Sequence, residues 1–367
     1  MEKRERGFFG KLLVLVFALL AFIGLVAMTL SVASPYIDPK RINWMPFFGL
    51  AFWEIFIFNV LVFIALLLLW SRKVWIAVLA LVIAIPGLKK SYSVGSQVNE
   101  DSFLRLMTYN VHHFRHVDGE TDKESHAFQV IDKIREQNPD VLCCQEFGVY
   151  QKGVSRVKAI ERFAQNAGFQ YVYYNKKRAY GGNVIFSKFP LTKVESETGL
   201  GKEITSGILV SVDAGEKGQF YLANLHLLSY NVSDSEIDVL TSSTELRNQF
   251  DTVGMSVVRK LKYAFERRSD EIAMILESLK PLDGPIVVCG DFNDTPMSFI
   301  YKQMQDAGFV DSFTKVGRGI KPTYAGKLPL MRIDYIWGND GVKPLKFKRF
   351  KNKSSDHYPI MLDLKIQ

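Results

Sequence analysis

A carboxylate and an amide stand two residues apart, directly after an apolar run in the second half of the chain. The run 285–289 is rich in β-branched residues and bounded by turn formers, which predicts a buried strand. Asp291 and Asn293 follow it within the segment Gly290-Asp-Phe-Asn-Asp. A carboxylate at the end of such a strand can hold a hard cation, and an amide can orient a phosphate oxygen. Taken alone, the pair fits an ordinary Asx turn equally well.

Five further segments place polar side chains at the ends of apolar runs. They contain Asn110, His112 and His113; Gln145 and Glu146; Asn183; Asn224 and His226; and Asp334 with Ser355, Asp356 and His357. Each has an ordinary structural explanation, such as a strand-end carboxylate, a core histidine or a turn cap. Six such segments in one stretch of chain favour a common site that combines carboxylates, amides and imidazoles.

The order of these segments resembles the endonuclease/exonuclease/phosphatase superfamily, metal-dependent phosphodiesterases that include DNase I-like nucleases and neutral sphingomyelinases. The resemblance covers about residues 103–367. The motifs that carry it are Gln145-Glu146, Asn224-Leu225-His226, Gly290-Asp291-Phe292-Asn293 and Ser355-Asp356-His357. It implies an α/β fold, a four-layer sandwich of two packed mixed β-sheets flanked by helices.

The resemblance also implies a site for Mg²⁺, with Mn²⁺ as the alternative. Asn110, Glu146 and Asp356 are the expected ligands. A cation offsets the negative charge of a phosphodiester and of its transition state. Mg²⁺ keeps several waters and needs only one or two carboxylates, so this small ligand set is sufficient.

The remaining roles belong to the attack of water on phosphorus. His357 is the expected base, because imidazole titrates near neutral pH. Asp334 is expected to hold the other ring nitrogen of His357, although the sequence leaves open an exchange of roles between Asp334 and Asp356. His226 would stabilise the phosphate or protonate the leaving oxygen.

Three amides and one carboxylate complete the expected site. Asp291 would orient the attacking water, and Asn293 would donate a hydrogen bond to a phosphate oxygen. Asn183 and Asn224 are expected to contact the substrate.

One position departs from the family pattern. His112 stands where several family members carry an acid near the metal. Together with His113 and His116, it either binds a transition metal or belongs to a solvated loop.

Alternating and continuous apolar runs predict the elements that position these groups. Strands are predicted at 103–110, 141–144, 171–175, 183–187, 209–213, 220–226, 286–289, 333–337, 345–350 and 360–364, and helices at 125–137, 155–167, 259–279 and 297–305. Many strands with interspersed helices indicate sheets that are covered on their outer faces.

The first ninety residues have a different composition. Apolar runs at 12–33, 47–70 and 73–88 predict about three transmembrane helices in a region 1–90. A polar linker, 91–102, leads to the domain 103–367. Basic residues before the first run favour an N-terminus inside the cell. Three crossings of the inner membrane would then leave the catalytic domain on the extracytoplasmic side, whereas two would leave it in the cytoplasm.

These observations predict a membrane-anchored, metal-dependent phosphoester hydrolase whose partners are the lipid bilayer and its substrate. The substrate classes left open are nucleic acid, phospholipid and sugar phosphate, and no obligate protein partner is indicated. The net charge of +8 fits a polyanionic substrate, although much of it flanks the apolar runs. The alternative is a catalytically silent binding scaffold with the same fold. The intact set of acids, amides and histidines argues against that alternative.

Overall fold

Two compact units make up the chain. The computed structural model describes residues 7–101, 103–114, 123–149, 151–175, 182–195, 206–233, 235–236, 239, 247–326, 330–351 and 354–367. The helical unit comprises Met1–Ser91 and a later segment, Thr295–Lys302. The sheet unit comprises Tyr92–Asp294 and Gln303–Gln367.

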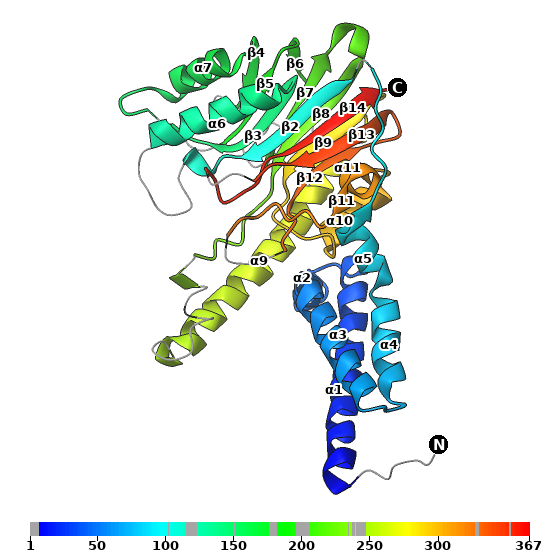
Figure 1. Ribbon diagram of the computed structural model, residues 1–367. Helices are drawn as coiled ribbons and strands as arrows, with labels where there is room; N and C mark the ends of the chain where they lie inside the picture. Colours follow the sequence, from blue (N-terminus) through cyan, green and yellow to red (C-terminus); the bar gives the residue numbers. More distant parts are fainter. Residues whose placement is uncertain are drawn as a thin grey trace. The chain divides into compact units, whose positions relative to one another are not determined.

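The helical unit is built on five helices (Figure 1). They are α1 (Phe8–Ala33), α2 (Met45–Leu50), α3 (Phe52–Leu68), α4 (Val74–Ile83) and α5 (Ile85–Ser91). Helix α1 packs against both α3 and α4. At the centre, the buried Asn59 side chain donates to the carbonyl of Gly24 at 3.1 Å and to that of Ile55 at 2.9 Å. A side chain at Gly24 would collide with this amide, so the glycine permits the close approach of α1 and α3.

The expectation of about three membrane-spanning helices is not met. Among the described residues, only Phe8–Tyr36 forms a helix long and apolar enough to cross a membrane, and a second span exists only if the bent pair α4 and α5 counts as one. The predicted run 47–70 breaks at Ala51 and leaves 17 residues in α3, which is about 26 Å of helix. The predicted run 73–88 bends by 45° between Ile83 and Ile85, next to Pro86.

The later segment of the helical unit, Thr295–Lys302, has an apolar anchor in Met297. Its side chain is buried in a cluster with Met28, Phe52, Ala80 and Ala84. The carbonyl of Met297 also approaches Gly49 so closely that a side chain there would collide with it. No pattern in the sequence predicts that a segment directly after Asp294 joins the helices.

The sheet unit contains two six-stranded mixed sheets, as the family resemblance implies. One has the order β10-β12-β9-β8-β7-β6 and the other β13-β14-β2-β3-β5-β4. Their strands are β2 (Leu104–Asn110), β3 (Val141–Phe147), β4 (Tyr171–Tyr174), β5 (Gly182–Ser187), β6 (Leu191–Lys193), β7 (Gly207–Asp213), β8 (Gln219–His226), β9 (Ile286–Asp291), β10 (Val310–Asp311), β12 (Asp334–Gly338), β13 (Val342–Arg349) and β14 (Ile360–Ile366). Each sheet has one parallel pair, β8 with β9 and β2 with β3, among antiparallel neighbours.

The core follows the alternation of side chains along the strands. Leu106 and Cys143 point into the layer between the sheets, with Leu222, Val287 and other residues of the facing sheet. The chain neighbours of Leu106 and Cys143, such as Met107 and Leu142, point the opposite way, into a second core under α6 (Lys123–Gln137) and α7 (Arg156–Ala167). These two helices cover the outer face of the sheet that contains β2 and β3 (Figure 1).

Helix α9 (Arg247–Leu279) is fastened beside the start of β7 and the end of β8. Its Glu271 carboxylate accepts from the Leu228 backbone at 2.9 Å and from the Ser206 hydroxyl. The remaining elements are α10 (Phe299–Asp306), α11 (Ser312–Val316), β1 (Ser93–Val94) and β11 (Arg318–Gly319). Because β1 pairs with β11, the predicted linker 91–102 is partly structured.

Candidate active site

Three of the expected side chains meet at one end of the first sheet. The parallel pairing of β8 with β9 sets His226 opposite Asp291. The antiparallel pairing of β12 with β9 sets Asp334 opposite the same Asp291. The register of three neighbouring strands therefore gathers one imidazole and two carboxylates, although 65 and 43 residues separate them from Asp291 along the chain.

The second sheet contributes Asn110 and Glu146 to the same site. The parallel pairing of β2 with β3 sets Asn110 opposite Gln145, and Glu146 follows with a left-handed backbone at φ 50°. The Asn110 amide donates to Glu146 Oε1 at 3.2 Å and to Asp291 Oδ2 at 3.0 Å. One amide therefore joins the carboxylates of the two sheets, with its own Oδ1 held by the backbone of His112 at 3.0 Å.

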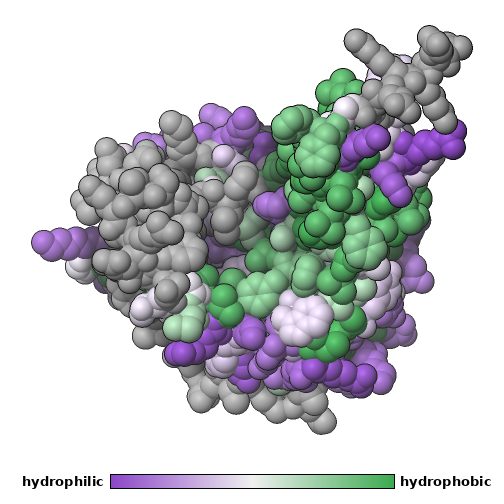
Figure 2. All heavy atoms as spheres, turned by 90° about the horizontal axis from the view of Figure 1, so that it is seen from below, coloured by the Kyte–Doolittle hydropathy of each residue, from purple (hydrophilic) through white to green (hydrophobic). Residues whose placement is uncertain are grey.

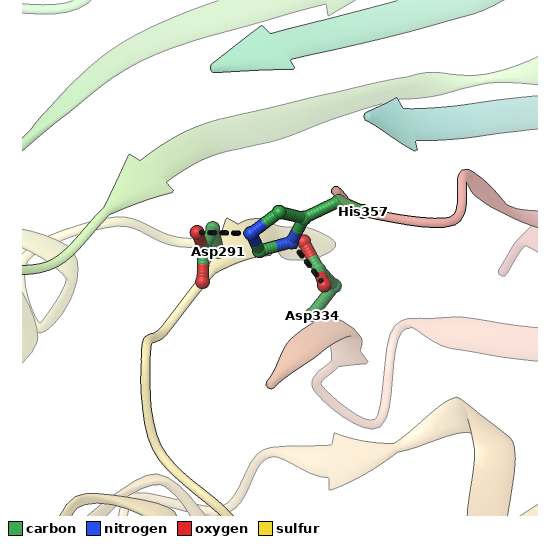
Figure 3. Close-up of side chains that lie close together, drawn as sticks. All are labelled: Asp291, Asp334 and His357. Atoms are coloured by element: carbon green, nitrogen blue, oxygen red, sulfur yellow. Dashed lines mark hydrogen bonds and ion pairs between the residues drawn. The ribbon is translucent and has the colours of Figure 1, made fainter. Parts of the chain in front are cut away.

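His357 lies between two buried carboxylates (Figure 3). Its Nδ1 is hydrogen-bonded to Asp334 Oδ2 at 3.0 Å, and its Nε2 lies 3.6 Å from Asp291 Oδ2. Burial raises the pKa of Asp291 to about 6, against the lowering effect of the His357 charge. Burial alone would lower the pKa of His357, but the charges of Asp334 and Asp291 outweigh it and hold this pKa well above its usual range.

The ring nitrogen Nε2 of His226 lies near both sheets. It is 3.5 Å from Glu146 Oε1 and 3.7 Å from Asp291 Oδ2. This nitrogen is buried and makes no hydrogen bond. Burial tends to raise the pKa of Glu146, but the His226 charge, the hydrogen bond from Asn110 and the charge of His113 together hold it below its usual range.

The turn after β9 is held by its own hydrogen bonds. Asn293 has a left-handed backbone, with φ 52°, and its N–H donates to Asp291 Oδ1 at 2.9 Å. Its side-chain amide donates to the carbonyl of Leu227 at 3.0 Å. Asn293 is therefore beside Asp291, as expected for a phosphate contact, while the amide itself supports the neighbouring strand end.

The two remaining amides of the expected set lie deeper, between the sheets. Asn224 is fully buried, and its side chain donates to the carbonyls of Cys144 and Val184 and accepts from Gln145 at 2.6 Å. Asn183 donates to the carbonyls of Ser206 and Asn224. Because these groups are satisfied inside the protein, their geometry suits positioning of Gln145 and Glu146 better than contact with a substrate.

Asp356 lies on the other side of the turn at His112. Its Oδ1 is 3.5 Å from His112 Nδ1 and 3.4 Å from the hydroxyl of Ser355, which also donates to the carbonyl of Asn110 at 2.7 Å. Asp356 is thus tied to the end of β2, near Asn110. His116, which the sequence grouped with His112 and His113, lies outside the described residues.

The donor set fits a divalent cation at Glu146 and Asp356. Both carboxylates are partly exposed, and a buried, unbonded imidazole nitrogen lies about 3.5 Å from each, His226 Nε2 and His112 Nδ1 respectively. Among the described residues, the acids and histidines whose ligand atoms gather within 4.8 Å of one another are instead Asp291, Asp334 and His357. Their hydrogen bond at His357 Nδ1 suits a base and its orienting carboxylate better than a second cation.

A buried ion pair next to the site was not expected from the sequence. Arg268 on α9 contacts Asp294 Oδ2 at 3.1 Å, donates to the carbonyl of Leu228 and stacks over the Tyr230 ring. It thereby ties the helix to the turn after Asn293. The only sequence signal was an arginine at a core-facing position of a predicted helix, which periodicity alone does not distinguish from a surface residue.

Comparison with a solved structure at a TM-score of 0.50 shows the same fold. The catalytic domain of human Nocturnin, with a bound sulfate anion, is 18% identical and matches 72% of this chain and 94% of its own, with a TM-score of 0.50. An endonuclease/exonuclease/phosphatase from Beutenbergia cavernae is 18% identical over 72% of both chains, with a TM-score of 0.49. The 3′ phosphatase NExo from Neisseria, bound to a product DNA hairpin, is 16% identical and matches 72% of this chain and 99% of its own, also at 0.49.

Comparisons with sequence families divide the chain at the same place as its composition does. No curated protein matches the sequence. A domain of unknown function, DUF8431, matches residues 11–91. The Endonuclease/Exonuclease/phosphatase family matches residues 107–357, from β2 to His357. The chain therefore belongs to the Endonuclease/Exonuclease/phosphatase family.

Proposed function

We propose that the protein is a divalent-metal-dependent phosphoester hydrolase, and more narrowly a phosphodiesterase. The observation that carries the proposal is the position of His357, with Asp334 on one ring nitrogen and Asp291 facing the other. A base that is oriented by a buried carboxylate is the arrangement that activates a water or hydroxyl nucleophile in many hydrolases.

Each residue of the site has a separate role in the proposed hydrolysis. Asp334 holds Nδ1 of His357, so that Nε2, in molecules in which His357 is unprotonated, takes the proton of a water placed beside Asp291. His226 stabilises charge on the phosphoryl group or returns a proton to the leaving oxygen. The side-chain amide of Asn293 has a second hydrogen besides the one given to Leu227, and this hydrogen can be donated to a phosphate oxygen beside Asp291.

Glu146 and Asp356 would hold the metal, with Asn110 fixing the Glu146 carboxylate. The bound ion would supply positive charge that offsets the charge of the phosphoryl group in the transition state. Mg²⁺ and Mn²⁺ are the ions expected for carboxylate ligands with remaining water.

The test is hydrolysis by the full-length protein in detergent, with Mg²⁺, with Mn²⁺ and with a chelator. The panel contains bis-p-nitrophenyl phosphate, p-nitrophenyl phosphate, plasmid DNA and sphingomyelin, which separates phosphodiesterase, phosphatase, nuclease and phospholipase activities. We expect metal-dependent turnover that a Glu146→Gln variant loses. Turnover that persists in the chelator would contradict the proposal, and a folded protein without turnover on any member would favour a silent scaffold.

We also propose that the helical unit attaches the protein to a lipid bilayer. Helix α1 leaves large apolar side chains exposed, among them Phe9, Leu15 and Leu19. Trp70, after α3, and Trp75, in the first turn of α4, are exposed as well. Figure 2 shows hydrophobic side chains gathered in one region of the face in view. Exposed apolar surface of this extent, bordered by tryptophans, is typical of lipid contact.

Vesicle flotation tests this attachment. The full-length protein should float with phosphatidylcholine vesicles after reconstitution and should remain with them in 1 M salt, because apolar contact is not screened. Release of the protein by salt would indicate peripheral binding through charge instead.

A further inference from the structure

Two charged side chains of α9 hold the backbone of Leu228, which lies two residues after His226. Arg268 Nη1 donates to the carbonyl of Leu228 at 2.9 Å, and Glu271 Oε2 accepts from the N–H of the same residue at 2.9 Å. Residues three apart lie on one face of a helix, so both side chains reach Leu228 from the same side. Both polar groups of this backbone are therefore fixed to α9.

Glu271 is also connected to His226 itself, through Ser206. Its Oε1 accepts from the hydroxyl of Ser206. The carbonyl of Ser206 in turn accepts from the N–H of His226 at 2.5 Å. The end of β8 is thus held both at His226 and two residues beyond it.

The guanidinium of Arg268 also contacts the turn after β9. Its Nη2 lies 3.1 Å from Asp294 Oδ2, three residues after Asp291 in the chain. The same turn is joined to the end of β8 by the N–H of Leu227, which donates to the carbonyl of Asp291 at 2.9 Å. One side chain therefore bridges the ends of the two strands that carry His226 and Asp291.

The burial of Arg268 favours a role in geometry over a role in stability. The side chain is fully buried, with its guanidinium carbon 4.3 Å from the centroid of the Tyr230 ring, and its Nε makes no hydrogen bond within the described part of the chain. A buried ion pair often contributes no more stability than well-packed apolar side chains do, because its charges lose their hydration. The planar fork of arginine, however, holds two acceptors at a fixed separation, which an apolar side chain does not do.

We propose that Arg268 is a positioning residue that, together with Glu271, fixes His226 relative to Asp291. The inference rests on the proposed function and adds the residues that set the separation of this imidazole from this carboxylate. His226 Nε2 lies 3.7 Å from Asp291 Oδ2. A small displacement of a group that acts on the transition state slows the reaction while leaving substrate binding in the ground state largely unchanged.

The test compares Arg268→Lys in the wild-type and His226→Ala backgrounds of the full-length protein in detergent. Lysine keeps the charge but lacks the fork that joins Leu228 to Asp294. Arg267→Lys, at the exposed arginine beside it on α9, is the matched control. The readouts are kcat and KM with bis-p-nitrophenyl phosphate and Mg²⁺, melting curves, and backbone hydrogen exchange in residues 224–230 and 289–294.

In the wild-type background, Arg268→Lys should lower kcat by roughly 10- to 100-fold with little change in KM. In the His226→Ala background it should have little further effect, because no imidazole is left to position. Hydrogen exchange should become faster in both segments, and Arg267→Lys should behave as wild type. Glu271→Gln, which removes the charge of the second side chain, should show the same dependence on His226 and serves as the test if Arg268→Lys does not fold.

Wild-type kcat and wild-type hydrogen exchange in folded Arg268→Lys would overturn the inference, and so would an equal loss of kcat in both backgrounds. A reduced kcat in His226→Ala beside an unaffected Arg268→Lys would leave the proposed function standing and remove only the inference. Absence of metal-dependent turnover in the wild-type protein would count against the proposed function, and hydrogen exchange would still decide whether Arg268 holds the two strand ends.

Discussion

At the scale of single residues, the site depends on which side chains stand opposite one another. The sequence left open whether Asp334 or Asp356 orients His357, and Asp356 is the immediate neighbour in the chain. The antiparallel register of β12 with β9 places Asp334 opposite Asp291, and its carboxylate lies 3.0 Å from His357 Nδ1. Strand register is set by tertiary pairing, which one sequence does not reveal, so the choice required the structure.

This assignment gives a prediction for Asp334→Asn. The variant keeps the shape of the side chain but offers no negative charge to the imidazolium, and its amide can select the wrong tautomer. We expect kcat to fall by roughly 10²–10⁴-fold with little change in KM. Steady-state kinetics on bis-p-nitrophenyl phosphate measure the effect.

Asp340→Asn, at an exposed aspartate between β12 and β13, is the matched control and should behave as wild type. An Asp334→Asn enzyme with wild-type kcat would show that another group orients His357.

At the scale of elements, apolar patterning located the strands that form the two sheets. The strand predicted at 286–289 is β9, which runs two residues further and ends on Asp291 itself. The strands that the sequence pattern did not predict are short, such as β1 and β10 with two residues each. They contain too few side chains to show the alternation of apolar and polar residues. Helix α9 begins at Arg247, twelve residues before the predicted start at 259.

The close pairing of β8 with β9 depends on Gly290. Its φ of 132° lies in a region that other residues rarely adopt, and a Cβ would collide with the carbonyl of Leu225. We expect Gly290→Ala to lower the thermal stability strongly and to displace Asp291.

Gly284→Ala separates the effect of backbone strain from that of the collision with Leu225. Gly284 has φ 118°, but no atoms lie near the position of a Cβ. It should cost only the backbone strain, about 1–3 kcal/mol, and Gly290→Ala should cost distinctly more. Equal shifts in melting temperature would show that the collision with Leu225 is relieved at no cost.

At the scale of the whole molecule, the change in composition near residue 90 predicts only part of the division into a helical unit and a sheet unit. The sequence separated residues 1–90 from the rest, but the helical unit also includes Thr295–Lys302. This segment follows Asp294 directly, and its Met297 is buried against helices more than 200 residues earlier in the chain. No local sequence pattern predicts that this segment packs against the N-terminal helices. A helix with one apolar face has the same pattern whichever element it packs against.

The packing of Thr295–Lys302 in the helical unit predicts that a fragment without the N-terminal helices aggregates. Residues 92–367 alone leave Met297 without the cluster that buries it. We therefore expect this fragment to aggregate more readily than the full-length protein in detergent, as measured by light scattering. Met297→Ser should reduce the aggregation of the fragment. A monomeric, stable fragment would show that Thr295–Lys302 has no need of the helical unit.

The most direct test of the account is the metal-dependent hydrolysis of bis-p-nitrophenyl phosphate by the full-length protein and by His357→Ala. The account predicts turnover that requires a divalent ion and that falls by roughly 10²–10⁴-fold in the folded variant. Wild-type turnover in folded His357→Ala would contradict it, because the imidazole held between Asp334 and Asp291 would then have no part in the reaction.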